Sequence, residues 1–258
     1  MPDLLYEKKD HYAIFTMNRP DRLNALGGAM QLELEEAMED FTADVEMRVG
    51  ILTGAGDRAF SAGADLKEMA ASSGQQMSPR AGSSVLESVF PFSYHPKPFI
   101  AAINGYAIGG GMERAMSCDI RIAADHAQFG LLEIKRGILA GYGIHNLSRL
   151  IPYGEAMYIL LSGDLISAEE AKRIGFVHSV VQKEQLMNEA VRIAEMIAAN
   201  APLSLRGTKA VANYWRHFNI GESTRWVSWV NEVVLSSEDA KEGPGAFAEK
   251  RQPVWKGR

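Results

Sequence analysis

The chain has 258 residues, of which 47% are hydrophobic and 23% charged, and this balance predicts a soluble globular protein with a substantial core. The formal net charge of −5 argues against a nucleic-acid-binding surface, and no run of about 20 apolar residues is present that could span a membrane. A single cysteine, Cys118, excludes an intrachain disulfide and is expected to be a small buried hydrophobe.

The N-terminal stretch, MPDLLYEKKDHYAIFTM, carries charges where a secretory signal needs a long apolar run. It is not rich in Arg and Ser, as a transit peptide would be. We therefore expect a cytoplasmic enzyme built from one large domain, or from one domain with a smaller appendage.

Strands and helices alternate in the first half of the chain. Residues 4–17 predict a β-hairpin that turns near Asp10, and residues 49–54 predict a short buried strand. Between them, residues 29–41 carry apolar side chains that share one helical face: Met30, Leu34, Met38 and Phe41. The polar stretch 70–79 is the best candidate for a mobile loop.

The second half becomes more helical. A strand is predicted at 99–103, and a helix at about 110–117 follows it. Ser167 and Glu170 have the spacing of a capping box at the start of a later helix. The last long helix carries an apolar face made by Trp226, Trp229, Val230 and Val233. This order indicates an α/β protein with a helical C-terminal part.

Spacing argues against several kinds of chemistry. No two histidines have ligand spacing with a carboxylate or the cysteine, so no protein-held metal is expected. A GxSxG nucleophile elbow and a P-loop are both absent. Residues 54–59, GAGDRA, match the loose dinucleotide pattern GxGxxA, but Gly63 interrupts the continuous helix that this pattern should open.

Two glycine-containing turns, FSAGADL at 60–66 and AIGGGME at 107–113, each follow a strand and precede a possible helix start. Glycine allows close approach of the backbone to a ligand, and the first N–H groups of a helix have no internal partner. Two such groups aimed at one oxygen would form an oxyanion hole. The spacing leaves this hypothesis and simple close packing equally open.

Two glutamates are candidates for acid–base chemistry. Glu113 lies in the first turn of the predicted helix, and Glu133 stands in an otherwise apolar stretch. Burial would raise the pKa of such a carboxyl group and suit it to proton transfer. The residues alone leave open whether each is instead a solvated carboxylate, and they do not show that the two side chains meet.

Several ordered segments resemble the crotonase, or enoyl-CoA hydratase/isomerase, superfamily. They are NRPDRLNAL (18–26), GAGDRAFSAGADLKEM (54–69), KPFIAAINGYAIGGGMERAMSCDIRIA (97–123), ISAEEAKRIGFVHSVV (166–181) and EDAKEGPGAFAEKRQPVWKGR (238–258). The resemblance implies a crotonase fold of repeated ββα units. It divides the chain into a core with the active site at 1–200 and a helical region at 201–258 that builds homotrimers, often paired into hexamers.

The resemblance also implies an acyl-CoA thioester as the ligand and gives roles to residues of this chain. The oxyanion hole would be formed by the backbone N–H groups of Ala64 and Gly110, and the catalytic pair would be Glu113 and Glu133. The residues expected to contact the CoA part of the substrate are Ala62, Ala64, Asp65, Leu66, Lys67, Gly110 and Lys250, the last from the same or from a neighbouring subunit.

Because family hydratases carry both glutamates, the resemblance favours reversible syn-hydration of a 2-enoyl-CoA to a 3-hydroxyacyl-CoA. Glu133 would serve proton transfer at C2, and Glu113 would orient and deprotonate the water. No metal and no redox cofactor is implied, since coenzyme A is part of the substrate. An enoyl-CoA isomerase or another enolate-forming enzyme, and a non-catalytic acyl-CoA-binding homologue, remain as alternatives.

The chain departs from the family pattern at two places. A turn that usually resembles PGAGG reads LAGYGIHNL at 139–147, where Tyr142 and His145 are candidates for the lining of an altered acyl pocket. Arg114 follows Glu113 where an apolar residue is typical. These departures argue against an ordinary straight-chain fatty acyl substrate.

Overall fold

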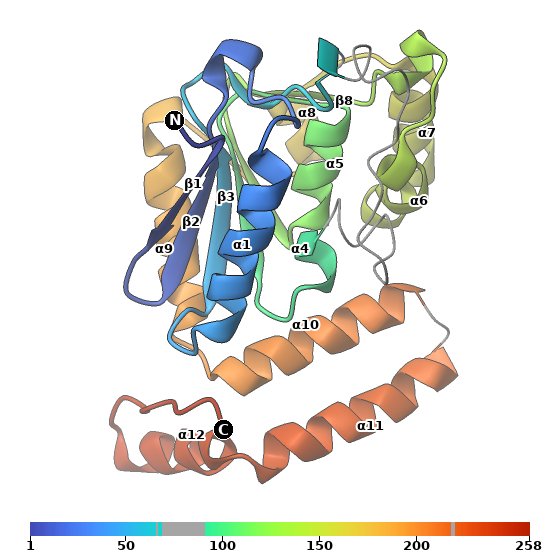
Figure 1. The fold of residues 1–258 in the computed structure, drawn as a ribbon. Helices are drawn as coiled ribbons and strands as arrows, with labels where there is room; N and C mark the ends of the chain where they lie inside the picture. The colour runs from blue at the N-terminus through green and yellow to red at the C-terminus, as the bar shows by residue number, and fades with distance from the viewer. Residues whose placement is uncertain (66, 69–90, 218–219) are drawn as a thin grey trace.

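The computed structural model describes residues 1–65, 67–68, 91–217 and 220–258 (Figure 1). The stretch 70–79, predicted as a mobile loop, and Leu66, predicted to contact CoA, lie outside these ranges.

A six-stranded sheet forms the centre of the core, in the order β1-β2-β3-β5-β7-β10. Strands β1 and β2 form an antiparallel hairpin, and every other neighbouring pair is parallel. The strand bounds are Leu4–Lys8, Tyr12–Met17, Val49–Gly54, Phe99–Ile103, Ile120–Ala124 and Ser179–Val181. The central strands are fully buried, as the apolar runs in the sequence predict for a parallel sheet covered on both faces.

A second sheet of four short strands has the order β4-β6-β8-β9, with bounds Ala59–Ser61, Tyr106–Ile108, Gln128–Gly130 and Ile166–Ser167. Strands β4, β6 and β8 are parallel to one another and follow β3, β5 and β7 in the chain. Each turn of the fold therefore adds one strand to each sheet. Because β4 and β6 end side by side, the segments that follow them start at the same edge.

Helices cover both faces of the six-stranded sheet (Figure 1). Helix α1 (Met30–Ala43) and helix α5 (Gly110–Ser117) lie on one side, and α9 (Leu186–Ala198) packs against β3, β5 and β7 on the other. Two apolar clusters result. One lies between the two sheets, α1 and α5, and the other lies under α9 and includes Ile51, Ile100, Ile122 and Ile193.

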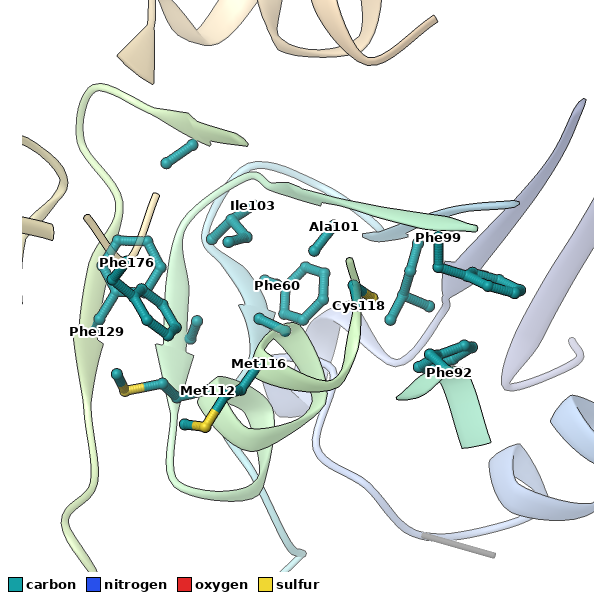
Figure 2. Packing of buried hydrophobic residues seen from close by; sticks show 14 of the residues in the cluster. Phe60, Phe92, Phe99, Ala101, Ile103, Met112, Met116, Cys118, Phe129 and Phe176 are labelled. Atoms are coloured by element: carbon teal, nitrogen blue, oxygen red, sulfur yellow. The ribbon is translucent and has the colours of Figure 1, made fainter. Parts of the chain in front are cut away.

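Figure 2 shows part of the larger cluster, where side chains of α5 meet phenylalanines of both sheets. Met112 and Met116 lie beside Phe60, and Cys118 lies near Phe99 at the end of the helix. Cys118 is 3% exposed, and burial raises the pKa of its thiol to about 12. The prediction that it is a small buried hydrophobe is confirmed.

The remaining helices of the core are short, and α8 packs against β8 and β9 of the second sheet. Their bounds are Pro91–Tyr94 for α4, Gly141–Leu150 for α6, Tyr153–Ser162 for α7 and Ala168–Arg173 for α8, with 3-10 turns η1 (Pro20–Arg22), η2 (Glu133–Arg136) and η3 (Lys183–Gln185). Ser167 accepts a hydrogen bond from the Glu170 N–H, which confirms the predicted cap of α8.

Three helices follow the core: α10 (Pro202–His217), α11 (Ile220–Ser236) and α12 (Glu238–Glu249). They form a separate layer below it in Figure 1. Lys209 of α10 anchors this layer, because its ammonium group donates to the carbonyl oxygens of Phe92 and Lys97 at 2.8 and 3.1 Å and to the Asp119 carboxylate at 2.7 Å. Within the described ranges, no helix combines the length and apolar character needed to cross a bilayer.

The packing of α5 on β4 gives a test of the fold. A Cβ on Gly111 would lie 2.1 Å from the Ser61 carbonyl oxygen, which is backbone and cannot rotate away. We therefore expect Gly111→Ala to lower the free energy of unfolding by about 1–3 kcal/mol or more. Gly154→Ala is the matched control, since a Cβ there meets nothing within 4 Å, and it should leave stability unchanged or slightly higher. Urea unfolding of both variants measures the difference; equal midpoints would contradict this packing.

Candidate active site

The three glycines at the start of α5 allow close contacts. Gly109 has a φ of 55°, and a Cβ there would lie 2.9 Å from Oε1 of Glu133. Gly111 lies against the backbone of Ser61. The glycine run therefore lets the helix start lie between β4 and the Glu133 carboxyl group.

The turn after β4 packs against the same helix start. Gly63 has a φ of 84°, and a Cβ there would lie 2.7 Å from the Ile108 carbonyl oxygen and 3.0 Å from the Gly110 nitrogen. Ala64 is held in a β-bridge to Leu26, whose N–H donates to the Gly63 carbonyl at 2.8 Å. A Cβ on Gly110 would lie 3.7 Å from the Ala64 nitrogen, so these two amide groups are close neighbours.

Both amide groups are available to a ligand. Within the part of the chain that the structure describes, neither the Ala64 N–H nor the Gly110 N–H has a hydrogen-bond acceptor. Gly110 is the first residue of α5, where the N–H has no intrahelical partner, and Ala64 is exposed. Two neighbouring amide donors can stabilise negative charge on one oxygen. The glycines thus have a packing role, and the same geometry can serve the predicted oxyanion hole.

Glu113 lies one turn into α5 and is only 5% exposed. Its Oε1 accepts a hydrogen bond of 2.7 Å from the Gly143 N–H, in the first turn of α6. Burial, and to a smaller extent the charge of Glu133, raise the pKa of the Glu113 carboxyl group to about 7, against the lowering effect of that hydrogen bond. Near neutral pH this carboxyl group can therefore both hold and release a proton.

Glu133 begins the 3-10 turn η2 and is partly buried. Its Oε2 is buried and has no hydrogen-bond partner within the described residues, while Oε1 faces Gly109. Burial raises the pKa of this carboxyl group above its usual value. An unpartnered buried carboxyl oxygen beside a free amide pair is available to a substrate or to a water molecule.

The residues predicted to contact CoA have different surroundings. Ala62 is partly exposed and Lys67 is exposed, so both can meet a ligand. Asp65 is buried instead, and its carboxylate accepts hydrogen bonds from Arg19 at 3.2 Å and from Arg22 at 2.8 Å. These contacts stabilise the turn after β4.

Lys250 ends α12 with a φ of 54°, in the lower layer of Figure 1 and away from the start of α5 within the same chain. A contact with CoA would need another subunit, and it stays a prediction.

The two candidates for the acyl pocket also differ. Tyr142 is buried, and its hydroxyl group forms a short hydrogen bond with Ser93 of α4. His145 is exposed one turn later on α6. Tyr142 is thus fixed beside Gly143 and Glu113, whereas His145 faces solvent in the single chain.

Two parts of this site were not predicted from the residues. The Gly143 N–H was not identified as the donor to Glu113. The two glycines of LAGYGIHNL, Gly141 and Gly143, were a signal that the backbone of this segment approaches another group closely. Ser93 was not identified as the partner of Tyr142, because nothing local in the sequence places α4 against α6.

Comparisons with known proteins show relatives that match nearly the whole chain. The family model described as enoyl-CoA hydratase/isomerase matches residues 7–258. The chain is 40% identical to an (E)-benzylidenesuccinyl-CoA hydratase of Thauera aromatica, over 97% of this chain and 98% of that protein. It is 39% identical to a short-chain-enoyl-CoA hydratase of Clostridium acetobutylicum, over 97% of this chain and 96% of the relative.

Solved structures give the same result for the fold. The crystal structure of an enoyl-CoA hydratase from Mycobacterium tuberculosis superimposes with a TM-score of 0.91 at 37% identity, and one from Bacillus anthracis with 0.90 at 35%. Both matches cover 100% of each chain. The predicted fold of ββα units is therefore confirmed, and the chain belongs to the enoyl-CoA hydratase/isomerase family, with the crotonase fold.

Proposed function

We propose that this protein catalyses the reversible syn-hydration of a 2-enoyl-CoA thioester to a 3-hydroxyacyl-CoA. The observation that carries the proposal is the pair of glutamates with raised pKa values, Glu113 and Glu133, beside the neighbouring free amide groups of Ala64 and Gly110. Relatives named as enoyl-CoA and crotonyl-CoA hydratases support acyl-CoA hydration as the reaction.

In the proposed mechanism the thioester carbonyl oxygen accepts hydrogen bonds from the N–H groups of Ala64 and Gly110. Negative charge grows on that oxygen as water attacks C3, and the two amides stabilise it there. Glu113, in its ionised form, takes a proton from the water. Glu133, in its protonated form, donates a proton to C2, so that H and OH add across the double bond. No metal or redox cofactor takes part.

The CoA part of the substrate is proposed to lie along the turn after β4, against Ala62, Ala64 and Lys67, with Lys250 supplied by a neighbouring subunit. The exposed positions of Ala64 and Lys67 support this placement, while Leu66 lies outside the described residues. Asp65 contributes to this site indirectly, because its hydrogen bonds with Arg19 and Arg22 stabilise the turn after β4.

We also propose that residues 1–200 form the catalytic core and residues 201–258 an oligomerisation region that builds a homotrimer or a pair of trimers. Exposed apolar side chains on α11 support this assignment, with Trp229 57% and Val233 45% exposed in the single chain. Trp229, Val230 and Val233 recur at helical spacing, as predicted, while the side chain of Trp226 lies outside the described part. A cytoplasmic location stays a prediction.

Crotonyl-CoA is the first substrate to test, because hydration removes the absorbance of the conjugated enoyl thioester. We expect that absorbance to fall on addition of the purified protein and to reappear when 3-hydroxybutyryl-CoA is supplied instead. A 3-enoyl-CoA that gains the absorbance, without loss from any 2-enoyl-CoA, would identify an isomerase. Binding of acyl-CoA without turnover of either substrate would identify a non-catalytic homologue.

The two glutamates can be separated from CoA binding by substitution. Glu113→Gln and Glu133→Gln should each lower kcat by about 10²–10⁴, because each removes one proton-transfer group. The dissociation constant for butyryl-CoA should change little, since neither side chain is proposed to contact the CoA moiety. Glu36→Gln, on the exposed face of α1, is the matched control and should keep full activity. Full activity in either site variant refutes that residue's role.

The rate of hydration should depend on pH near neutrality. Burial raises the pKa of Glu113 to about 7, and only its ionised form can accept a proton from water. The value of kcat/KM should therefore fall as the pH drops through about 7. Glu133 must be protonated to donate to C2, and burial raises its pKa, which extends its protonated form to higher pH than for an exposed carboxyl group. A pH–rate profile flat between pH 5 and 8 would contradict the assignment of Glu113 as the base.

A further inference from the structure

Arg114 is a buried cation with almost no partners. It lies on α5, directly after Glu113, and is 3% exposed. Within the described residues, its guanidinium group makes one long hydrogen bond, 3.4 Å from Nη2 to Oε1 of Gln31 on α1, and its Nε makes none. The nearby Glu35 carboxylate accepts a hydrogen bond from the Gln31 amide at 3.1 Å and does not pair with Arg114.

The other three buried cations of the described residues, Lys97, Arg121 and Lys209, are well satisfied. Lys97 donates to three backbone carbonyl groups, and Lys209 pairs with Asp119 and two carbonyl groups. Arg121 donates to two carbonyl groups at 2.7 Å each. A buried charge without such partners costs several kcal/mol in the free protein. Arg114 is thus the exception, and the free protein gains no evident stability from its charge.

Helix geometry places Arg114 one turn beyond Gly110, on the face of α5 next to that of Glu113. Glu113 and Arg114 lie three and four residues after Gly110, about one turn further along α5. Viewed down the helix axis, Glu113 is rotated about 60° from Gly110 in one direction and Arg114 about 40° in the other. Helical side chains lean toward the N-terminus, and therefore toward the Gly110 amide. Glu113 faces α6 through Gly143, whereas Arg114 faces α1 through Gln31. We infer that an acyl group bound at the Gly110 amide extends along α5 between these two side chains.

This inference rests on the proposed hydratase function. We propose that Arg114 binds a free carboxylate on the acyl group, so that the substrate is the mono-CoA thioester of an unsaturated dicarboxylic acid. A carboxylate can accept two parallel hydrogen bonds from the guanidinium group. Its negative charge also balances the positive charge that the protein leaves uncompensated. The pKa of Arg114 is lowered by burial only to about 10, so the side chain is charged near neutral pH.

Binding of saturated acyl-CoAs tests the proposal without any turnover. Two matched pairs are succinyl-CoA against butyryl-CoA and glutaryl-CoA against pentanoyl-CoA, measured by titration calorimetry. In at least one pair, the wild-type protein should bind the member with the carboxylate about 30-fold or more tightly than the methyl-ended member. Arg114→Leu should abolish this preference, and Arg114→Lys should keep part of it, because an ammonium group cannot form the two-pronged contact.

A second variant keeps the arginine in place. Gln31→Glu puts a carboxylate beside the same guanidinium group, so it should compete with the ligand and reduce the preference. Arg192→Gln, on the exposed face of α9, is the charge-matched control and should leave the preference unchanged. The melting temperature of Arg114→Leu should equal or exceed that of the wild type, since an uncompensated buried charge is removed.

The proposal is overturned if the wild-type protein shows no preference in either pair. It is also overturned if Arg114→Leu weakens both members of a pair equally, which is the result of a purely structural role. Because these titrations need no reaction, they judge the carboxylate preference separately from enoyl-CoA hydration. Failure of the titrations leaves the proposed activity standing, and a lack of turnover with crotonyl-CoA leaves the carboxylate preference standing.

Discussion

The direct backbone contact between two turns is the constraint on which the site depends. Gly63 and Gly111 bring the end of β4 and the start of α5 so close that added Cβ atoms would overlap carbonyl oxygens of the neighbouring segment. The two-sheet topology makes this contact possible, because β4 and β6 are parallel neighbours and end at the same edge. The amides of Ala64 and Gly110 become neighbours as a consequence. Any side chain at Gly63 or Gly111 would separate them.

The electrostatics of Glu113 follow from the same packing. Helix α5 has its first turn buried between β4 and α6, so the carboxyl group loses most of its hydration. The Gly143 N–H replaces part of that hydration and favours the ionised form, yet burial has the larger effect on the pKa. A carboxyl pKa near neutral pH thus depends on both a close-packed helix start and a backbone N–H donor from another element.

The sequence predicted the local structure well where the signal was itself local. The hairpin at 4–17, the apolar face of α1, the bounds of α5 and the Ser167 cap all depend on spacing within one segment, and the structure confirms each of them. The hydrogen bond between Glu113 and Gly143 joins residues that are 30 positions apart in the chain. The periodicity of a single segment carries no information about such a contact. The resemblance to a family supplied the pairing of the two glutamates.

Position 114 shows how one fold can serve different acyl groups. The residues that shape the amide pair and the proton-transfer groups lie on the α6 and β4 sides of α5, while position 114 faces α1. A change there leaves the glycine contacts and the Glu113 hydrogen bond in place, because it touches neither. In the proposed mechanism the catalytic groups contact only the thioester and its double bond, which every enoyl-CoA shares. Discrimination between acyl groups would then come from side chains that flank the acyl group, and a buried guanidinium group without an anionic partner would select by charge as well as by shape.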